Sequence, residues 1–382
     1  MDVVYNHTYY SYSWLERTVP GYWNRRWENG SMTNGSGCGC DLASERTMVR
    51  KYLVDSCVYW AKEYHVDGFR FDLMALHDVD TMNAIRAALD ALPGGEDILM
   101  YGEPWQGGST RMEHGAIPAN KQAAGLLDSR IGFFCDNTRD AIKGGVFNAG
   151  SAGYINGDMH CGYQVLHSIP AWRGGQADFM PQAPGQVVQY VSAHDNYTLW
   201  DKLKCVARRG DYAAPDADLL AQNRMAAGIY LTCQGLPFMQ GGEEFARTKH
   251  GDHNTYRGPL ELNRLDWTRA AQLEELVQYY HGLLEIRKAY PELSGMAGDA
   301  EPCILSLPGW LIGFVPERRD ESLPGRLAVY YNPERTRQWA ALPAGSWRYL
   351  CDGTRAAAEP FGPACRNAIE LAPVSMTILK VE

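Results

Sequence analysis

The sequence predicts an α/β protein, with a (β/α)8-barrel catalytic domain over residues 1–292 and a small antiparallel β-sandwich over residues 293–382. Strand-like apolar runs alternate with helix-like amphipathic segments through most of the chain, which indicates a parallel sheet with crossover helices. Several of these runs end in polar or charged residues, and barrel enzymes carry their active sites at the carboxyl ends of their strands. Near the C-terminus, short β-like runs separated by Pro and Gly replace the helical pattern.

Charge and composition narrow the classes of partner. The 382 residues carry a formal net charge of -9, which argues against partners bound through basic patches, such as nucleic acids or anionic membranes. No apolar run approaches the roughly 18 residues that a membrane span needs. The ten cysteines are scattered, which favours free thiols over a disulfide framework and therefore a cytoplasmic location. Because we expect the true N-terminus to lie upstream of Met1, any signal sequence would lie there too, and the location stays open. The sequence indicates no particular oligomeric state.

The N-terminal part predicts a strand, a long loop and a helix. Asp2–Thr8 resembles the end of a buried strand that enters a polar loop. Residues 9–40 lack periodicity and are rich in Gly, Asn, Ser and Trp, and a connection of that length usually binds a ligand or forms a lid. Residues 44–64 repeat apolar side chains at helical spacing, with Ser44 as the expected N-cap.

The strand-like run over residues 66–74 carries two charges. Because side chains alternate along a strand, Arg70 and Asp72 should share one face, opposite Phe69 and Phe71. One interpretation is an ion pair that only fixes the strand. The other is a catalytic carboxylate that the arginine keeps ionised.

The later elements continue the alternation of strands and helices. The predicted strands end near ionisable residues at Glu103 and Asp195, and the C-terminal runs read as strands only. The expected helices are 80–92, 218–230 and 273–286, and the expected strands are 98–105, 131–135, 187–196, 310–315, 327–331 and 375–379.

Three acids therefore stand at predicted strand ends: Asp72, Glu103 and Asp195. Retaining glycosidases need one carboxylate nucleophile and one proton donor, about 5 to 5.5 Å apart. Arg70 should keep Asp72 ionised, whereas Glu103 has no cation nearby in the sequence and partial desolvation should keep it protonated. Asp72 is thus the expected nucleophile and Glu103 the expected acid/base, while Asp195 could stabilise the oxocarbenium-like transition state.

Four motifs, in order along the chain, resemble the signature regions of the α-amylase family of glycoside hydrolases. They are Asp2-Val-Val-Tyr-Asn-His7, Gly68-Phe-Arg-Phe-Asp72, Gly102-Glu-Pro-Trp105 and Ser192-Ala-His-Asp-Asn196. The chain is more similar still to the type I pullulanase group, through Gly35-Ser-Gly-Cys-Gly39, Thr198-Leu-Trp-Asp-Lys202 and Gln240-Gly-Gly-Glu-Glu-Phe245. The resemblance covers most of residues 1–292.

The resemblance implies hydrolysis of α-1,6 branch linkages in pullulan, amylopectin and limit dextrins, through a covalent glucosyl-Asp intermediate. It gives Asp72, Glu103 and Asp195 the three catalytic roles above. It implies a branched α-glucan or oligosaccharide as partner and no required cofactor. Calcium occurs in relatives, but no motif here indicates a calcium site or metal ligands. The substrate-binding residues implied are His7, Arg70, Trp105, His194 and Asn196.

The chain also departs from that group. Cys40 and Leu260 stand where the group tends to have polar or acidic residues, which puts nearby subsites in question. The first signature region, normally on the third barrel strand, begins here at residue 2, so we expect a barrel that lacks its first two β/α units. Met1 then resembles an internal methionine or a fragment boundary. Because six strands leave two unpaired edges, we expect this chain alone to be poorly stable and weakly active.

Two kinds of alternative stay open. An isoamylase, an α-amylase or a branching enzyme would share these carboxylates and differ in linkage or acceptor, although the motif that ends at Trp105 and the glycine loop over 35–39 favour a pullulanase. A non-catalytic glucan-binding protein would bind branched dextrins without turnover. The presence of all three acids together with Arg70 argues against it.

Overall fold

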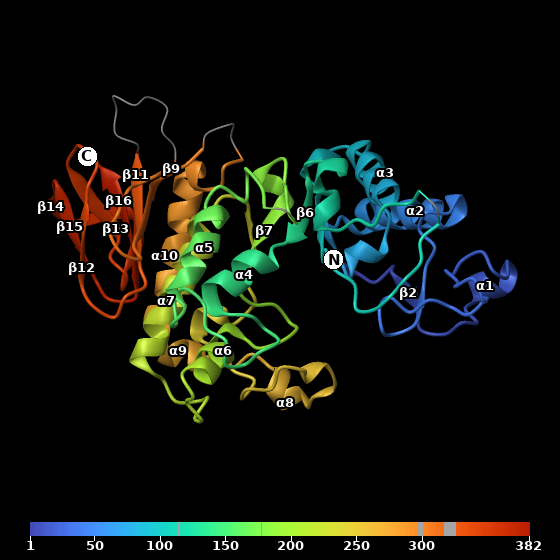
Figure 1. The fold of residues 1–382 in the computed structure, drawn as a ribbon, viewed down its shortest axis with the longest axis horizontal. Helices are drawn as coiled ribbons and strands as arrows, with labels where there is room; N and C mark the ends of the chain where they lie inside the picture. Colours follow the sequence, from blue (N-terminus) through green and yellow to red (C-terminus); the bar gives the residue numbers. More distant parts are fainter. Residues whose placement is uncertain (114, 177, 297–300, 317–325) are drawn as a thin grey trace. The chain divides into compact units, whose positions relative to one another are not determined.

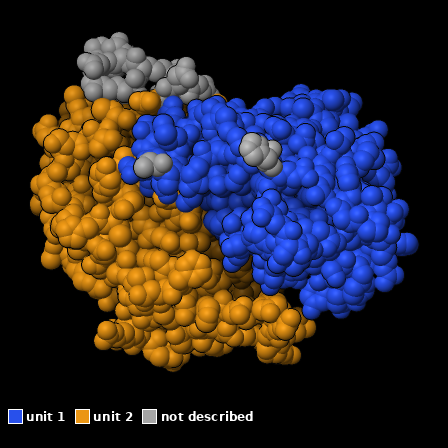
Figure 2. All heavy atoms as spheres, turned by 45° about the vertical axis from the view of Figure 1, so that its right-hand side comes forward, with its two compact units in different colours: residues 1–134, 172–188 blue, residues 135–171, 189–382 orange. Residues whose placement is uncertain are grey.

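The computed structural model describes residues 1–113, 115–176, 178–296, 301–316 and 326–382. The chain forms two compact units (Figure 2). Unit 1 comprises residues 1–134 and 172–188, and unit 2 comprises residues 135–171 and 189–382. The predicted boundary between residues 292 and 293 falls inside unit 2 and stays a prediction.

Unit 1 is built on parallel strands in the order β1-β4-β5-β6-β7. Both phenylalanines of β4, Phe69 and Phe71, are fully buried, as expected for a strand covered on both faces. The predicted strand over 66–74 is shorter than expected, because Leu73 adopts a left-handed conformation with φ 39° and turns the chain. The strands are β1 (Asp2–Val3), β4 (Gly68–Phe71), β5 (Leu99–Gly102), β6 (Ile131–Phe134) and β7 (Val187–Gln189), whose last residue belongs to unit 2.

Two helices of unit 1 lie close to their predicted positions. Helix α2 (Thr47–Tyr64) buries one side chain per turn, from Val49 to Ala61. The predicted N-cap at Ser44 is wrong: Arg46 precedes the helix, and the Ser44 hydroxyl instead bonds to Asp78. Helix α3 (Val79–Asp90) begins after Asp78, whose side chain accepts a hydrogen bond from the backbone of the third residue on.

The long N-terminal loop contains more regular structure than the sequence predicts. A short helix, α1 (Trp14–Thr18), lies within it, and β2 (His7–Thr8) pairs with β3 (Cys40–Asp41). The buried Glu16 carboxylate accepts backbone hydrogen bonds from residues 21, 23 and 24 and an ion pair from Arg26. Burial opposes ionisation, yet these donors hold the pKa of Glu16 below its usual value. Local polar contacts therefore order this loop without a periodic apolar pattern.

Unit 2 combines helices with a short strand. Strand β8 (Leu236–Pro237) lies beside the end of β7, where Phe238 donates a backbone hydrogen bond to Gln189. The helices are α4 (Asp136–Lys143), α5 (Gly162–Ser168), α6 (Leu199–Val206), α7 (Ala217–Thr232), α8 (Leu260–Asn263), α9 (Trp267–Gln272) and α10 (Glu274–Ala289).

The C-terminal part of unit 2 forms antiparallel sheets, which confirms the predicted change of texture. One sheet has the order β14-β13-β16-β11-β10-β9, and β12 pairs with β15 separately. Helices α7 and α10 pack against the larger sheet (Figure 1), and Ile229 and Leu283 share one apolar core with Val329 and Ile378. The strands are β9 (Cys303–Ile304), β10 (Ile312–Val315), β11 (Leu327–Asn332), β12 (Gln338–Ala341), β13 (Trp347–Cys351), β14 (Ala356–Cys365), β15 (Ala368–Leu371) and β16 (Ser375–Val381).

Short 3-10 helices complete both units. They are η1 (Met74–Leu76), η2 (Gly95–Asp97), η3 (Lys121–Leu126), η4 (Met159–Cys161), η5 (Pro184–Gln186), η6 (Glu243–Phe245), η7 (Thr255–Arg257) and η8 (Pro291–Leu293). The ten cysteines are thiols and not disulfides, and Cys57, Cys135 and Cys233 are buried. In the part of the chain that the structure describes, no helix has both the length and the apolar character of a membrane span.

Candidate active site

Asp72 and Glu103 follow two neighbouring parallel strands. Strands β4 and β5 pair Phe71 with Gly102, and the backbone of Glu103 donates to the Phe71 carbonyl at 3.0 Å. Because paired strands lie about 4.8 Å apart, the next residue on each strand stands beside its neighbour. A Cβ atom at Gly102 would come within 2.7 Å of Met74, so a glycine is needed where the chain turns after β4. Register therefore brings the two predicted acids together.

Arg70 joins the two carboxylates. Its Nη1 lies 3.1 Å from Asp72 Oδ1 and its Nη2 lies 2.5 Å from Glu103 Oε1, while Nε lies 3.3 Å from Asp2 Oδ1. The predicted common face of Arg70 and Asp72 is confirmed. Glu103 has no cation among its sequence neighbours, but Arg70 reaches it from the adjacent strand. Arg70 alone does not distinguish the two acids.

The two acids differ in burial and in their remaining contacts. The Asp72 side chain is 26% exposed, and its Oδ2 accepts a hydrogen bond from Asn6 Nδ2 at 2.9 Å. The Glu103 side chain is only 7% exposed, and its Oε2 accepts from the Leu73 backbone N–H at 2.9 Å. The left-handed turn at Leu73 directs that N–H toward Glu103. The two carboxylates share the same cation, and they therefore differ mainly in how deeply they are buried.

Asn6 is a site residue that the sequence analysis missed. It is fully buried, and its amide donates both to the Asp72 carbonyl at 2.8 Å and to the Asp72 carboxylate. Its Oδ1 lies 2.5 Å from His7 Nδ1, so it links the predicted substrate-binding histidine to the predicted nucleophile. The sequence feature that could have identified Asn6 is an amide side chain placed just after a buried strand and next to His7.

Trp105 lies in the loop that follows β5. Its side chain is half-buried. The loop is attached to the glycine-rich segment over residues 35–39, because the backbone of Gly108 donates to the Gly35 carbonyl at 2.7 Å. A Cβ atom at Gly35 would come within 2.6 Å of Leu76 and 2.9 Å of Thr110. The glycine at position 35 thus allows three loops of unit 1 to meet.

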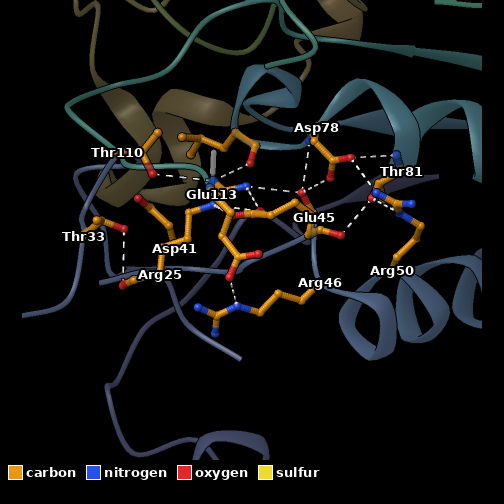
Figure 3. Close-up of polar contacts among 12 residues, drawn as sticks. Arg25, Thr33, Asp41, Glu45, Arg46, Arg50, Asp78, Thr81, Thr110 and Glu113 are labelled. Atoms are coloured by element: carbon orange, nitrogen blue, oxygen red, sulfur yellow. Dashed lines mark hydrogen bonds and ion pairs between the residues drawn. The ribbon is translucent and has the colours of Figure 1, made fainter. Parts of the chain in front are cut away.

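A buried arginine connects the same loops through side chains (Figure 3). Arg25 forms a two-point ion pair with Glu45, from Nε at 3.0 Å and from Nη2 at 2.7 Å. Its Nη1 donates to the carbonyl of Leu76 at 2.8 Å and lies 3.5 Å from the Thr110 hydroxyl. Leu76 follows Asp72 in the chain, and Thr110 follows Glu103. Arg25 therefore ties the long N-terminal loop to the segments that leave both acids.

Asp78 anchors a second part of this polar network (Figure 3). Its carboxylate accepts from the Ser44 hydroxyl at 2.7 Å, from Arg50 Nη2 at 3.0 Å and from the Thr81 backbone at 3.0 Å. Burial opposes its charge, but these donors hold the pKa of Asp78 below its usual range. The helix that begins after Asp78 is thus fixed to the segment before α2.

His77 is a buried histidine that packs against Phe71. The ring is 1% exposed and stands edge-on to Phe71, with ring centres 6.1 Å apart. Neither ring nitrogen has a hydrogen-bond partner among the described residues. Burial, helped by the charge of Arg25, lowers the pKa of His77 to about 4, although Asp78 and Asp72 oppose this shift. The imidazole is therefore neutral at physiological pH.

The other predicted site residues lie in unit 2, in the bend between β7 and α6. His194 and Asp195 are exposed, with 3.6 Å between His194 Nε2 and Asp195 Oδ1. Asn196 has a left-handed backbone with φ 63°. Across the described ranges of both units, no three His, Cys, Asp or Glu side chains gather as ligands for a metal ion.

Sequence comparison relates the chain to pullulanases. The pullulanase of Bacillus subtilis (strain 168) is 41% identical over 302 residues, which covers 76% of this chain and 40% of that protein. Pullulanase 1, chloroplastic, of Arabidopsis thaliana is 28% identical over 322 residues, which covers 70% of this chain and 33% of that protein. The chain thus spans less than half the length of these relatives. No protein-family model matches the sequence.

Solved structures of pullulanases match the whole chain. The pullulanase from Bacillus acidopullulyticus matches with a TM-score of 0.89 at 35% identity, over 100% of this chain and 46% of that one. The pullulanase from Anoxybacillus sp. LM18-11, complexed with maltotetraose, matches with a TM-score of 0.87 at 34% identity, over 100% of this chain and 53% of that one. The predicted resemblance to type I pullulanases is confirmed.

Proposed function

The chain belongs to the type I pullulanases, and from that premise we propose that it carries the active site of a retaining glycoside hydrolase. Its substrates would be the α-1,6 branch linkages of pullulan, amylopectin and limit dextrins. The observation that supports this most strongly is the pair of carboxylates, Asp72 and Glu103, which follow paired strands and share one guanidinium.

Two acids suffice for the proposed chemistry. The Asp72 carboxylate attacks the anomeric carbon while Glu103 protonates the glycosidic oxygen, so that the C–O bond breaks and a glucosyl-Asp ester forms. Glu103 then removes a proton from a water molecule, which attacks the same carbon and releases Asp72. Asp72, more exposed and bonded to Asn6, suits the anionic nucleophile, and the more buried Glu103 suits the proton donor.

Arg70 has a positioning task in this scheme. It holds one oxygen of each acid and so fixes the two side chains relative to each other. The backbone N–H of Leu73 donates to the second Glu103 oxygen, so each oxygen of that carboxyl group has a donor that orients it. Both contacts come from the strand and turn that carry the nucleophile.

Sequence motifs supply the rest of the proposed site. Asp195 is assigned the third carboxylate, which stabilises the positively charged transition state. His7, Trp105, His194 and Asn196 are assigned to sugar binding. We infer that the parallel strands belong to a (β/α)8-type barrel, with no cofactor required and calcium left open.

Substitution of the two acids tests the proposal. With pullulan, both Asp72→Asn and Glu103→Gln should abolish the release of maltotriose units. A maltosyl fluoride separates the roles, because fluoride leaves without protonation: Glu103→Gln should still release fluoride in a single turnover, and Asp72→Asn should not. Asp80→Asn, an exposed acid on α3, is the matched control and should keep full activity. Unchanged pullulan hydrolysis by Asp72→Asn would refute the assignment.

The products decide among the alternatives. Chain transfer without net release of reducing ends would indicate a branching enzyme, and binding of branched dextrin without turnover would indicate a glucan-binding protein. Because the chain spans 40% of the Bacillus subtilis relative, we also expect weak hydrolysis by this chain alone. Equal rates for this chain and for a protein with the full length of that relative would contradict this expectation.

A further inference from the structure

The segment that follows β8 contacts the chain on both sides of Asp195. We call residues 243–249 the clamp segment and residues 192–198 the Asp195 loop. Both belong to unit 2. Two polar contacts join them, and a third joins the clamp segment to Asp201, just after the loop. Each contact involves a side chain that is almost completely buried.

The first contact precedes Asp195 by three residues. The Ser192 hydroxyl donates to Glu243 Oε2 at 2.6 Å. The other oxygen of Glu243 accepts from Tyr230 at 3.0 Å and from Tyr280 at 3.2 Å. These tyrosines belong to α7 and α10, so the start of the Asp195 loop is attached to two long helices.

The second contact lies next to Asp195. Lys249 Nζ donates to the carbonyl of His194 at 3.2 Å and to the hydroxyl of Thr255 at 2.7 Å. Burial and the charge of Arg247 lower the pKa of Lys249, and the charge of Asp195 opposes this shift. The ammonium group therefore holds the backbone directly before Asp195.

The third contact lies after the loop. Asp201, on α6, accepts from the Thr248 hydroxyl at 2.5 Å and from the Lys249 backbone at 2.7 Å. The clamp segment thus forms hydrogen bonds with residues 192 and 194 before Asp195 and with residue 201 after it. A loop fixed at both ends retains little conformational freedom.

The Asp195 loop needs such support. The Asp195 side chain is 67% exposed, so surrounding side chains do not enclose it. The next residue, Asn196, has a φ of 63°, a conformation that costs energy and persists only where neighbouring structure enforces it. The position of the carboxylate must therefore come from its backbone.

We propose that Lys249 and Glu243 are positioning residues that hold Asp195 in place for the reaction. The inference rests on the proposed function, in which Asp195 stabilises the transition state. Neither residue needs to touch the substrate, since each acts through the backbone or hydroxyl that it binds in the Asp195 loop.

Hydrogen exchange of the full chain tests the clamp without requiring activity. Lys249→Met and Ser192→Ala should each speed amide exchange in peptides that cover residues 193–197 by about 10- to 100-fold, the loss expected for a hydrogen bond to a charged group. Lys204→Met is the matched control. Lys204 is an equally buried lysine that donates to a single carbonyl, Ala214 at 2.8 Å, and this variant should leave exchange in those peptides unchanged.

Kinetics provide a readout that a general loss of stability would not produce. Lys249→Met should lower kcat on pullulan about tenfold or more with KM within about twofold, because the lost orientation matters in the transition state. Lys249→Arg, which keeps the charge and the donors, should recover part of kcat. Ser192→Ala removes only one hydroxyl and serves if the lysine variant does not fold.

The outcomes separate the clamp from the catalytic assignment. Unchanged exchange at 193–197 in both Lys249→Met and Ser192→Ala would overturn the proposal, as would an equal increase in Lys204→Met. Faster exchange in the first two variants, together with full pullulan hydrolysis by Asp195→Asn, would support the clamp and refute the catalytic role of Asp195.

Discussion

Arg25 is the residue whose replacement should most disturb the loops around the two acids without touching either acid. Arg25→Met removes a side chain that is 1% exposed from its ion pair with Glu45, which is 5% exposed. The methionine fills similar space but leaves the Glu45 carboxylate buried without its cation. The Leu76 carbonyl loses its donor in the same step.

The expected cost follows from these contacts. Removal of one partner of a buried ion pair costs about 3 to 5 kcal/mol, because the remaining charge stays desolvated. The unpaired carbonyl adds about 1 kcal/mol or more. Arg25→Met combined with Glu45→Met should recover much of this loss, since it removes the uncompensated charge as well.

Hydrogen exchange measured against urea concentration is the suitable assay, because a chain with two compact units need not unfold in one step. In Arg25→Met, the opening free energy of peptides over residues 23–46 should fall by about 4 to 6 kcal/mol. The matched control is Arg111→Met: Arg111 is 46% exposed and pairs with Glu28, which is 86% exposed, so the loss should stay below about 1 kcal/mol. Equal losses in the two single variants would refute the argument.

Three further predictions concern unit 1. Folding lowers the pKa of His77 from 6.5 to about 4, so the unfolded chain binds the proton more readily than the folded chain. The free energy of unfolding should therefore be constant with respect to His77 above pH 6.5 and fall by about 3 kcal/mol as the pH drops to 4. His77→Asn should abolish this decrease in thermal unfolding scans, whereas a loss of the slope in His65→Asn, an exposed site, would contradict it. Gly35→Ala would put a Cβ 2.6 Å from a leucine atom and should cost about 1 to 3 kcal/mol in urea unfolding, whereas Gly210→Ala, with nothing within 4 Å, should be neutral. Asn6→Ala removes an amide donor from the proposed nucleophile and should lower kcat on pullulan about 10- to 100-fold; an unchanged kcat would exclude that contact from the mechanism.

The elements with strong periodicity could be predicted from the sequence. Helix α2 repeats buried positions at Val49, Leu53 and Cys57, and β4 is a short run in which Phe69, Arg70 and Phe71 are all buried. The one-dimensional patterns were therefore sufficient to predict both elements. The common face of Arg70 and Asp72 followed from the same alternation. What failed was the end of each element: the turn at Leu73 and the start of α2 depend on tertiary hydrogen bonds rather than on local preference.

The electrostatics of the candidate site could not be predicted in the same way. The contact between Arg70 and Glu103 joins residues 33 positions apart in the chain, and only strand register reveals it. Asn6 was missed because its partner, Asp72, is 66 positions away. Sequence patterns therefore identify the acids, while the groups that hold each acid come from pairing between strands.

The apolar core that Ile229 and Leu283 share with the antiparallel sheet has a practical consequence for engineering. Helix α10 approaches β14 so closely that a Cβ at Gly282 would stand 2.0 Å from the Ala356 carbonyl. A chain that ends at residue 292 would expose the apolar surface of these helices to water and should aggregate on expression. In a chimera between related enzymes, these helices and the sheet should therefore be transplanted together as one cassette.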